Sequence, residues 1–293
     1  MPASIPALAI ARPVQPLLQS PGVAGQVLAA FDRSCYVESR EGRIIAVLSE
    51  PLGRGAFALT VRATPSFRHV PPGHPVEVRD EHLQVGDLRI HLTPAAVWDP
   101  ALPTLAAPAD RGMRAVRMFL RWAAPEEGLA RVLYLEHESP LLTQARQGLG
   151  LLREALQEGD VASLTAAASR LAGLGPGLTP SGDDLLAGVL LACHLWPDRA
   201  GPLGTRAVGQ IVLETARVRT GRVSQAYLEA ASAGHAPDRW HDFVRRLPGD
   251  PHQAVDAAAR ILETGETSGA DMLAGFLYAW QMGETAAPAR AGV

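Results

Sequence analysis

The residues best suited to chemistry stand in two short stretches that match one another. SGDDLLAGVLLA begins at Ser181 and SGADMLAGFLYA begins at Ser268, and eight of the twelve positions are identical. Each copy has an aspartate at its fourth place, Asp184 or Asp271, ahead of an apolar helical pattern. A carboxylate can accept a proton from a substrate, or a hydrogen bond from an N–H group of the substrate. Asp184 and Asp271 are therefore the candidate catalytic residues.

The small residues of the two copies predict that these carboxylates lie close to one another. Ala187-Gly188 and Ala274-Gly275 would allow two helices to cross closely. Each aspartate lies three to four residues before its Ala-Gly pair, or about 6 Å along its helix axis, so the carboxylates would stand within about 12 Å of one another. The sequence therefore predicts one shared site, and helix N-termini on opposite sides of the domain would contradict it.

The loop before the first copy, LAGLGPGLTPSGDD, is rich in glycine. Ordering a glycine costs more backbone entropy than ordering other residues, and a helix cap needs at most one. A glycine-rich loop that leads into a helix N-terminus is typical of anion sites. The candidate substrate-binding residues are Gly175, Gly177, Thr179, Ser181, Gly182 and Asp183, with Ser268 and Gly269 from the second copy. On this interpretation Gly182→Ala weakens ligand binding and leaves the fold largely intact.

A purely structural interpretation stays open for the same residues. Thr179 or Ser181 would be the N-cap, with Pro180 in the first helical position if the cap is Thr179. The aspartates would then only complement the helix dipole. No cofactor is expected, and a Mg²⁺ site formed by Asp183, Asp184 and Asp271 is an alternative.

A third segment, ETARVRTGRVSQAYLEAASAG (214–234), adds hydrogen-bond donors around a helix–helix connection. Arg219, Thr220, Arg222 and Ser224 would form a clamp for phosphate or carboxylate, because the arginine fork binds both. The alternative is a surface connection with solvated arginines. The chain has no lysine, so all 27 basic residues are arginine. Schiff-base chemistry and a P-loop lysine are therefore excluded within this chain.

The elements that must position these residues fall into two parts, and the fold class is α+β. Residues 1–110 predict a β-rich, mostly antiparallel N-terminal domain, with a hairpin between SCYVES and RIIAVLS. Residues 111–293 predict an α-helical domain that carries the site. Its helices are expected at about 141–156, 161–172, 183–196, 203–219, 223–233, 239–247, 252–263 and 269–282, with Gly159 and Asp160 ending one helix and capping the next.

Composition and charge argue against some classes of partner and location. A net charge of −3 without a basic cluster argues against nucleic acid, and apolar runs shorter than about 18 residues argue against a membrane span. The N-terminal stretch predicts no signal peptide, and Cys35 and Cys193 match no metal spacing. A cytoplasmic protein is expected. The histidines of the first half match no metal motif either: His69, His74, His82 and His91.

The motifs GLGPGLTPSGDDLLAG, RTGRVS and GETSGADMLAG, in this order, resemble the AllH-like family. Its named member is the third subunit of the oxamate carbamoyltransferase of anaerobic allantoin degradation. The similarity extends over most of the chain, including the β-rich start and the AAVWDP segment around Trp98. The GLGPGLTPSGDD motif is highly specific for this family and says little about the substrate.

The resemblance implies transfer of a carbamoyl group between phosphate and the amide of oxamate, with other carbamoyltransferase subunits as partners and a small anionic substrate. Such a reaction needs donors for phosphate and for a developing oxyanion, and an acceptor for an amide N–H. We therefore expect the backbone of residues 175–182 to bind the anion, Arg219 and Arg222 to neutralise charge, and Asp184 or Asp271 to accept the amide N–H. Two rival functions stay open. One is a regulatory module that binds a small anion or a nucleotide without catalysis, and the other is a kinase-like phosphotransferase, which the missing lysine disfavours.

Overall fold

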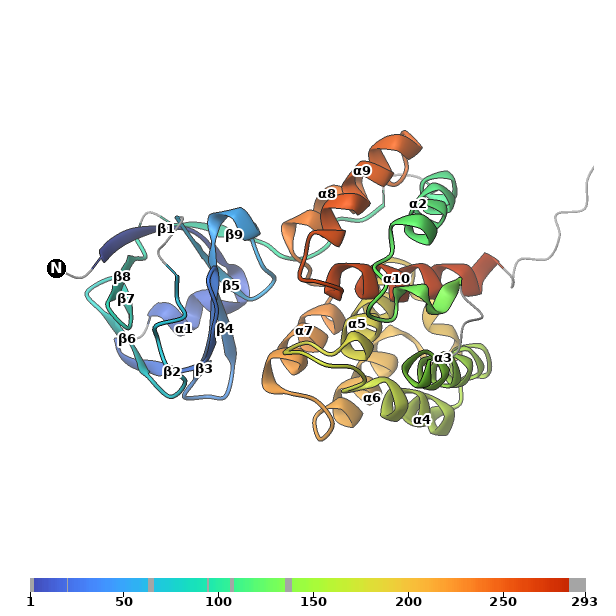
Figure 1. Cartoon of the computed structure of the whole chain (residues 1–293), viewed down its shortest axis with the longest axis horizontal. Helices are drawn as coiled ribbons and strands as arrows, with labels where there is room; N and C mark the ends of the chain where they lie inside the picture. The colour runs from blue at the N-terminus through green and yellow to red at the C-terminus, as the bar shows by residue number, and fades with distance from the viewer. Residues whose placement is uncertain are drawn as a thin grey trace, which may run out of the picture. The chain divides into compact units, whose positions relative to one another are not determined.

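The chain divides into two compact units in the computed structural model (Figure 1). The structure describes residues 3–19, 21–62, 66–93, 95–105, 108–134 and 139–284. Unit 1 comprises residues 1–101 together with 236–238, and unit 2 comprises residues 102–235 together with 239–293. The proline-rich stretch from Pro100 to Pro108 includes residues 106 and 107, which lie outside the described residues.

Unit 1 is built on one sheet with the strand order β5-β4-β3-β2-β6-β7-β8-β1-β9, in which β5 also pairs with β1. Six of the nine pairings are antiparallel, and the β1–β8, β1–β9 and β4–β5 pairs are parallel. The strands are β1 (Ala3–Ala11), β2 (Gly22–Ala30), β3 (Ser34–Ser39), β4 (Ile44–Ser49), β5 (Ala58–Val61), β6 (Pro75–Arg79), β7 (His82–Val85), β8 (Leu88–His91) and β9 (Ala96–Trp98). Three short helices join them: η1 (Arg12–Val14), α1 (Gln15–Gln19) and η2 (Glu50–Leu52).

The predicted hairpin is confirmed, because β3 and β4 pair antiparallel with Cys35 opposite Val47. The next turn, between β6 and β7, holds two non-glycine residues at positive φ, Asp80 at 45° and Glu81 at 64°. Two consecutive residues of this kind are what a two-residue hairpin turn requires. β1 and β2 carry proline or glycine and were not singled out by any sequence motif. β1 pairs with strands far along the chain, as Ile5 does with Ile90, whereas β2 pairs with the next strand, β3, and with β6.

Unit 2 is helical, and its described part contains no strand. The helices are α2 (Asp110–Ala123), η3 (Ala130–Leu133), α3 (Pro140–Glu158), α4 (Val161–Leu171), α5 (Ser181–Leu195), η4 (Pro197–Leu203), α6 (Thr205–Ala216), α7 (Arg222–Ser232), α8 (Asp238–Arg246), α9 (Pro251–Leu262) and α10 (Ser268–Glu284). The predicted α+β class with segregated elements is therefore confirmed.

Local sequence explains where several of these helices begin and end. Gly159 ends α3 in the left-handed region, with φ 76°. Asp160 follows as the N-cap of α4, where its carboxylate accepts the N–H groups of Ala162 and Ser163. Asp250 caps α9 in the same way. These are the favourable stop and start residues of a helix, so the expectation for Gly159 and Asp160 is confirmed.

The core of unit 2 is organised around α5 and α10, which pack against each other (Figure 1). Every residue of α5 from Ser181 to Cys193 is buried, including Asp183 and Asp184. A helix that is apolar on all sides belongs inside a domain, where neighbouring helices cover it. No helix in the described part of the chain is both long enough and apolar enough to cross a membrane.

Candidate functional site

Two glycines set the crossing of α5 and α10. A Cβ atom on Gly188 would stand 1.8 Å from the carbonyl oxygen of Met272, and a Cβ atom on Gly275 would stand 1.9 Å from that of Leu185. The two glycines occupy equivalent places in the two sequence copies, and so do the residues that they contact. The internal repeat therefore forms a pair of helices related by local pseudo-twofold symmetry, and only glycine allows this close approach.

The crossing brings the two helix N-termini to the same side of the unit. Thr179 Oγ1 lies 3.0 Å from Ser268 Oγ, and Ser181 Oγ lies 3.5 Å from Thr267 Oγ1. The expectation that the two copies meet at one place is confirmed by these contacts. We call the hydroxyl groups and aspartates at the N-terminal ends of α5 and α10 the N-terminal polar cluster. Its residues are Thr179, Ser181, Asp183, Asp184, Thr267, Ser268 and Asp271.

Two further glycines seat these N-termini on the preceding helices. A Cβ atom on Gly182 would lie 2.0 Å from the carbonyl oxygen of Leu171 at the end of α4. A Cβ atom on Gly269 would lie 1.9 Å from that of Ile261 near the end of α9. The expectation that Gly182→Ala would leave the fold intact is therefore wrong, because the added methyl group collides with backbone.

The loop glycines have a conformational role. Gly173, Gly175 and Gly177 have φ values of 75°, 107° and 102°, which side-chain-bearing residues rarely adopt. Their positive φ values let the chain turn sharply between α4 and α5. The turning of the chain thus accounts for much of the glycine content that the sequence suggested was needed for a ligand.

The start of α5 differs from both capping arrangements predicted from the sequence. Its N-cap is Pro180, and no side chain caps the helix. The N–H groups of Asp183 and Asp184 donate to Pro180 O, and the N–H of Gly182 donates to Leu174 O at 2.8 Å. Thr179 and Ser181 do not act as caps because their hydroxyl groups reach across to the second copy. The backbone donors at Gly182, Asp183 and Asp184 are thus already engaged within the protein.

Asp183 joins the glycine loop to the third segment. Its Oδ1 accepts the N–H of Gly173 at 2.9 Å, and its Oδ2 accepts the hydroxyl of Thr220. Burial raises the pKa of Asp183, and the hydrogen bonds from Thr220, Gly173 and Ser224 partly offset that rise. With both oxygens engaged, Asp183 holds the loops together.

Asp271 joins α10 to the segment before η3. Its Oδ1 accepts the N–H of Leu129 at 2.6 Å, and its side chain is 0% exposed. Burial raises the pKa of Asp271, and hydrogen bonds from Ser181, Leu129 and neighbouring groups oppose the rise. Its Oδ2 has no hydrogen-bond partner among the described residues.

Asp184 is the most perturbed carboxyl group of the cluster. Burial raises its pKa well above the ordinary value, and the nearby charges of Asp271 and Asp183 add to the rise. Hydrogen bonds from Ser268 and Thr179 oppose it. Its Oδ2 is buried without a hydrogen-bond partner in the described part of the chain. Carboxyl groups whose pKa is perturbed by burial and by neighbouring charges are typical of functional sites.

The third segment contributes hydroxyl groups to the cluster and leaves its guanidinium groups exposed. Ser224 is fully buried and its hydroxyl donates to Leu178 O at 3.4 Å. Arg222 is exposed and donates to Gln225 Oε1 at 3.0 Å. Arg219 is also exposed, and its carbonyl oxygen lies against Gly173. Thr220 and Ser224 thus lie in the cluster, while the two arginines lie at the surface beside it.

Three aspartates of the cluster were the candidate ligands for Mg²⁺. Within the described ranges, no group of three or more His, Cys, Asp or Glu side chains is arranged to hold a metal ion. The arrangement of Asp183, Asp184 and Asp271 therefore gives no support to the Mg²⁺ alternative.

Several contributors to the cluster were not predicted from the sequence. Leu129 acts through its backbone N–H, which carries no sequence signal. Gly128, with φ 84°, lies so close to Asp271 that a Cβ atom there would stand 2.8 Å from both carboxylate oxygens. Thr267 was the one detectable residue, because it precedes the second Ser-Gly pair directly.

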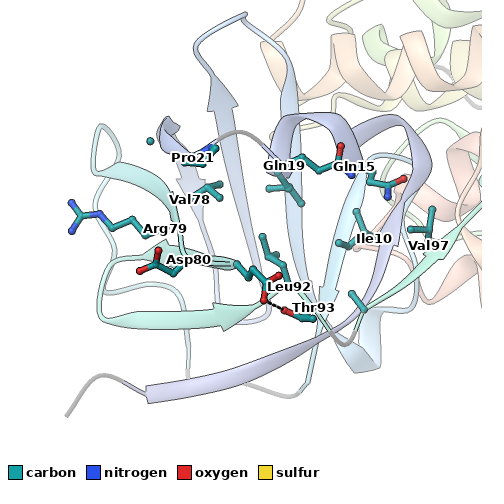
Figure 2. Close-up of a pocket in the computed structure, with 14 residues that line it drawn as sticks. Ile10, Gln15, Gln19, Pro21, Val78, Arg79, Asp80, Leu92, Thr93 and Val97 are labelled. Atoms are coloured by element: carbon teal, nitrogen blue, oxygen red, sulfur yellow. Dashed lines mark hydrogen bonds between the residues drawn. The ribbon is translucent and has the colours of Figure 1, made fainter.

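A separate cavity of about 780 Å³ lies in unit 1 and was not predicted (Figure 2). Its apolar walls include Ile10, Leu18 and Leu92, while Asp80 and Arg79 lie toward one side. The four histidines of unit 1 are not among its lining residues. This cavity brings none of the sequence-predicted site residues together.

Comparison with known proteins bears on both units. The family described as oxamate carbamoyltransferase subunit AllH matches residues 171–280, which contain the whole polar cluster apart from the segment at Leu129. The N-terminal domain of the AllH family matches residues 6–97. No solved structure matches the chain at a significant level. The two matches cover most of the chain in the expected order, and the chain belongs to the AllH family.

Proposed function

We propose that this chain is a subunit of a heteromeric carbamoyltransferase that acts between carbamoyl phosphate and oxamate, and that its N-terminal polar cluster contacts the substrate. Membership of a family named for an oxamate carbamoyltransferase subunit supports the reaction class. The observation that carries the choice of site is the pairing of Thr179 with Ser268, because it gathers the polar first turns of both repeat copies.

The reaction sets clear demands on the site. The amide nitrogen of oxamate forms a bond to the carbamoyl carbon, the bond from that carbon to the phosphate oxygen breaks, and the amide nitrogen loses a proton. A positioned general base accelerates such a proton transfer by about 10²–10⁴-fold. Donors are also needed for the developing negative charge on oxygen.

Asp184 is the residue best placed to accept the proton. Both oxygens of Asp183 are occupied. Asp271 has one oxygen bound to Leu129 and one without a partner, but it is 0% exposed, whereas Asp184 is 7% exposed. Asp184 also has a buried oxygen without a hydrogen-bond partner among the described residues, and its pKa is raised well above the ordinary value by burial and by the charges of Asp271 and Asp183. We assign Asp183 and Asp271 to positioning: they hold the loops, and their charges raise the pKa of Asp184.

The remaining candidates form the rim of the site. Thr179, Thr220 and Ser268 are partly exposed and offer hydroxyl donors. Arg219 and Arg222 lie exposed on either side of Thr220–Gly221, where they would neutralise the phosphate of carbamoyl phosphate. Gly175 and Gly177, with their positive φ values, allow the turn of the loop that precedes Ser181.

A regulatory module that binds a small anion or a nucleotide is the second candidate. The burial of the carboxylates favours it, since Asp184 is 7% exposed and Asp271 is 0% exposed. On this alternative the cluster stabilises the fold and the partner subunits perform the chemistry.

The deciding experiment measures carbamoyl transfer from carbamoyl phosphate to oxamate by the chain alone and co-expressed with its partner subunits. We expect turnover only in the complex, and a loss of at least about 100-fold in kcat for Asp184→Asn. Asp160→Asn is the matched control, because it changes a capping carboxylate at the start of α4. Ligand binding without turnover in any combination would favour the regulatory module, and full activity of Asp184→Asn in an assembled complex would overturn the site assignment.

A further inference from the structure

Unit 2 contains a cavity of about 430 Å³ whose lining includes no residue of the N-terminal polar cluster. Its lining residues come from α3, η3 and the later turns of α10. Tyr278, one of its lining residues, follows Asp271 by seven residues on α10, or about 10 Å along the helix axis. The lining residues are Val132, Leu133, Arg146, Leu149, Gly150, Arg153, Glu154, Tyr278 and Gln281.

Two arginines on one stripe of α3 give this cavity its positive charge. Arg146, Gly150 and Arg153 follow one another at intervals of four and three residues, so they share a helix face. Nη2 of Arg146 is buried and has no hydrogen-bond partner among the described residues. No ion pair among those residues includes Arg146 or Arg153. An arginine cannot shed its charge, and a buried donor without a partner is costly, so this nitrogen favours an anionic acceptor.

The glycine between the two arginines keeps the space open. A Cβ atom on Gly150 would meet nothing within 4 Å. Glycine inside a helix costs about 0.5–1 kcal/mol relative to alanine. Nothing in the surrounding protein requires glycine here, in contrast to Gly188 and Gly275. The missing side chain leaves room between two guanidinium groups.

Tyr278 lines the cavity, and a hydrogen bond holds its side chain in place. Its hydroxyl donates to Leu149 O at 2.6 Å, and its ring is 6% exposed. The guanidinium carbon of Arg153 lies 5.6 Å from the ring centroid, within the range of a cation–π contact. The ring therefore orients Arg153. Glu154 and Gln281 add a carboxylate and an amide at the border, which suit a ligand that also carries N–H donors.

We propose that this cavity, with Arg146 and Arg153 as its cationic residues, binds a small molecule through a carboxylate or phosphate group. Arginine forks bind both groups, often with two parallel hydrogen bonds. The proposal does not rest on the carbamoyltransferase assignment, because its residues are distinct from the N-terminal polar cluster.

Binding of inorganic phosphate and of oxamate to the full chain, each measured by isothermal titration calorimetry, tests the proposal and separates the two anion types. We expect at least one of them to bind at this cavity. Arg153→Gln should weaken that binding at least tenfold, and Gly150→Leu should abolish it by filling the space. Gly150→Leu should keep or raise the melting temperature, because leucine forms helices better than glycine.

Two controls separate this cavity from other sites. Arg206→Gln removes an exposed arginine from α6 and should leave binding unchanged. Asp184→Asn should also retain the binding, whatever its effect on carbamoyl transfer. The proposal is wrong if neither anion binds, or if Gly150→Leu and Arg153→Gln bind as well as the unmodified chain.

Discussion

Gly188 of α5 lies directly against the backbone of Met272 in α10, where an added Cβ atom would stand 1.8 Å from the carbonyl oxygen. The reciprocal contact, of Gly275 with Leu185, has nearly the same geometry. This relationship places both repeat copies side by side, and the polar cluster exists because of it.

Gly188→Ala should destabilise unit 2 by about 1–3 kcal/mol or more, because overpacking at a backbone contact forces the helices apart. Gly275→Ala should act similarly. Urea denaturation monitored by circular dichroism measures the change in the free energy of unfolding. The matched control is Gly150→Ala, which meets open space and should be neutral or stabilising by up to about 1 kcal/mol. Equal stability of Gly188→Ala and Gly150→Ala would contradict the packing role.

Gly182→Ala should lower stability by a similar amount, about 1–3 kcal/mol, because its Cβ atom would lie 2.0 Å from Leu171 O. Gly221→Ala is the control from the neighbouring segment, since its φ is −71° and a Cβ atom there meets nothing within 4 Å. Thermal melting of the two variants distinguishes them. A folded Gly182→Ala protein with normal stability and impaired ligand binding would restore the ligand-contact interpretation of this glycine.

Asp184→Asn should make the protein more stable at neutral pH and should flatten the dependence of its stability on pH. The folded-state pKa of Asp184 is raised above the ordinary 3.8, so between the two pKa values the folded protein holds a proton that the unfolded chain has lost. Stability therefore falls as the pH rises from the unfolded-state pKa to the folded-state pKa. Asparagine carries no titrating proton and removes this contribution, leaving those of Asp183 and Asp271.

Asp160→Asn should change the pH dependence of stability in the opposite direction. Hydrogen bonds from Ser163 and Ala162 lower the pKa of Asp160, so its contribution is present above the unfolded-state pKa and is lost as the pH falls through the folded-state pKa. Urea titrations between about pH 3 and pH 8 would reveal both slopes. A steeper decline of stability with rising pH in Asp184→Asn than in the unmodified chain would show that the carboxylate is stabilised by its surroundings.

Asp271→Ala should cost about 1–3 kcal/mol, since it leaves the N–H of Leu129 buried without its acceptor. Asp271→Asn should cost less, because the amide oxygen can still accept that hydrogen bond. Hydrogen exchange of the Leu129 amide, measured by NMR, reports the contact directly. Unchanged protection of this amide in Asp271→Ala would exclude the anchoring role.

Much of this architecture could be predicted from the sequence, because its signals are local. The helical period of α3, the left-handed Gly159 and the capping Asp160 act within a few residues, so helix bounds followed closely. The similarity of the segments at Ser181 and Ser268 predicted two helices of one kind. Their Ala-Gly pairs correctly indicated a close crossing.

Only the tertiary structure decided what each polar group does. Thr179 had a suitable position for an N-cap, yet its hydroxyl bonds to Ser268, which lies 89 residues away. The acceptor for Leu129 N–H is Asp271, across 142 residues. Such choices depend on which helix faces meet and how closely, and the crossing at Gly188 and Gly275 fixes both. Local sequence therefore determined the elements and the candidate residues, and helix packing determined which carboxylate oxygens remain without a partner.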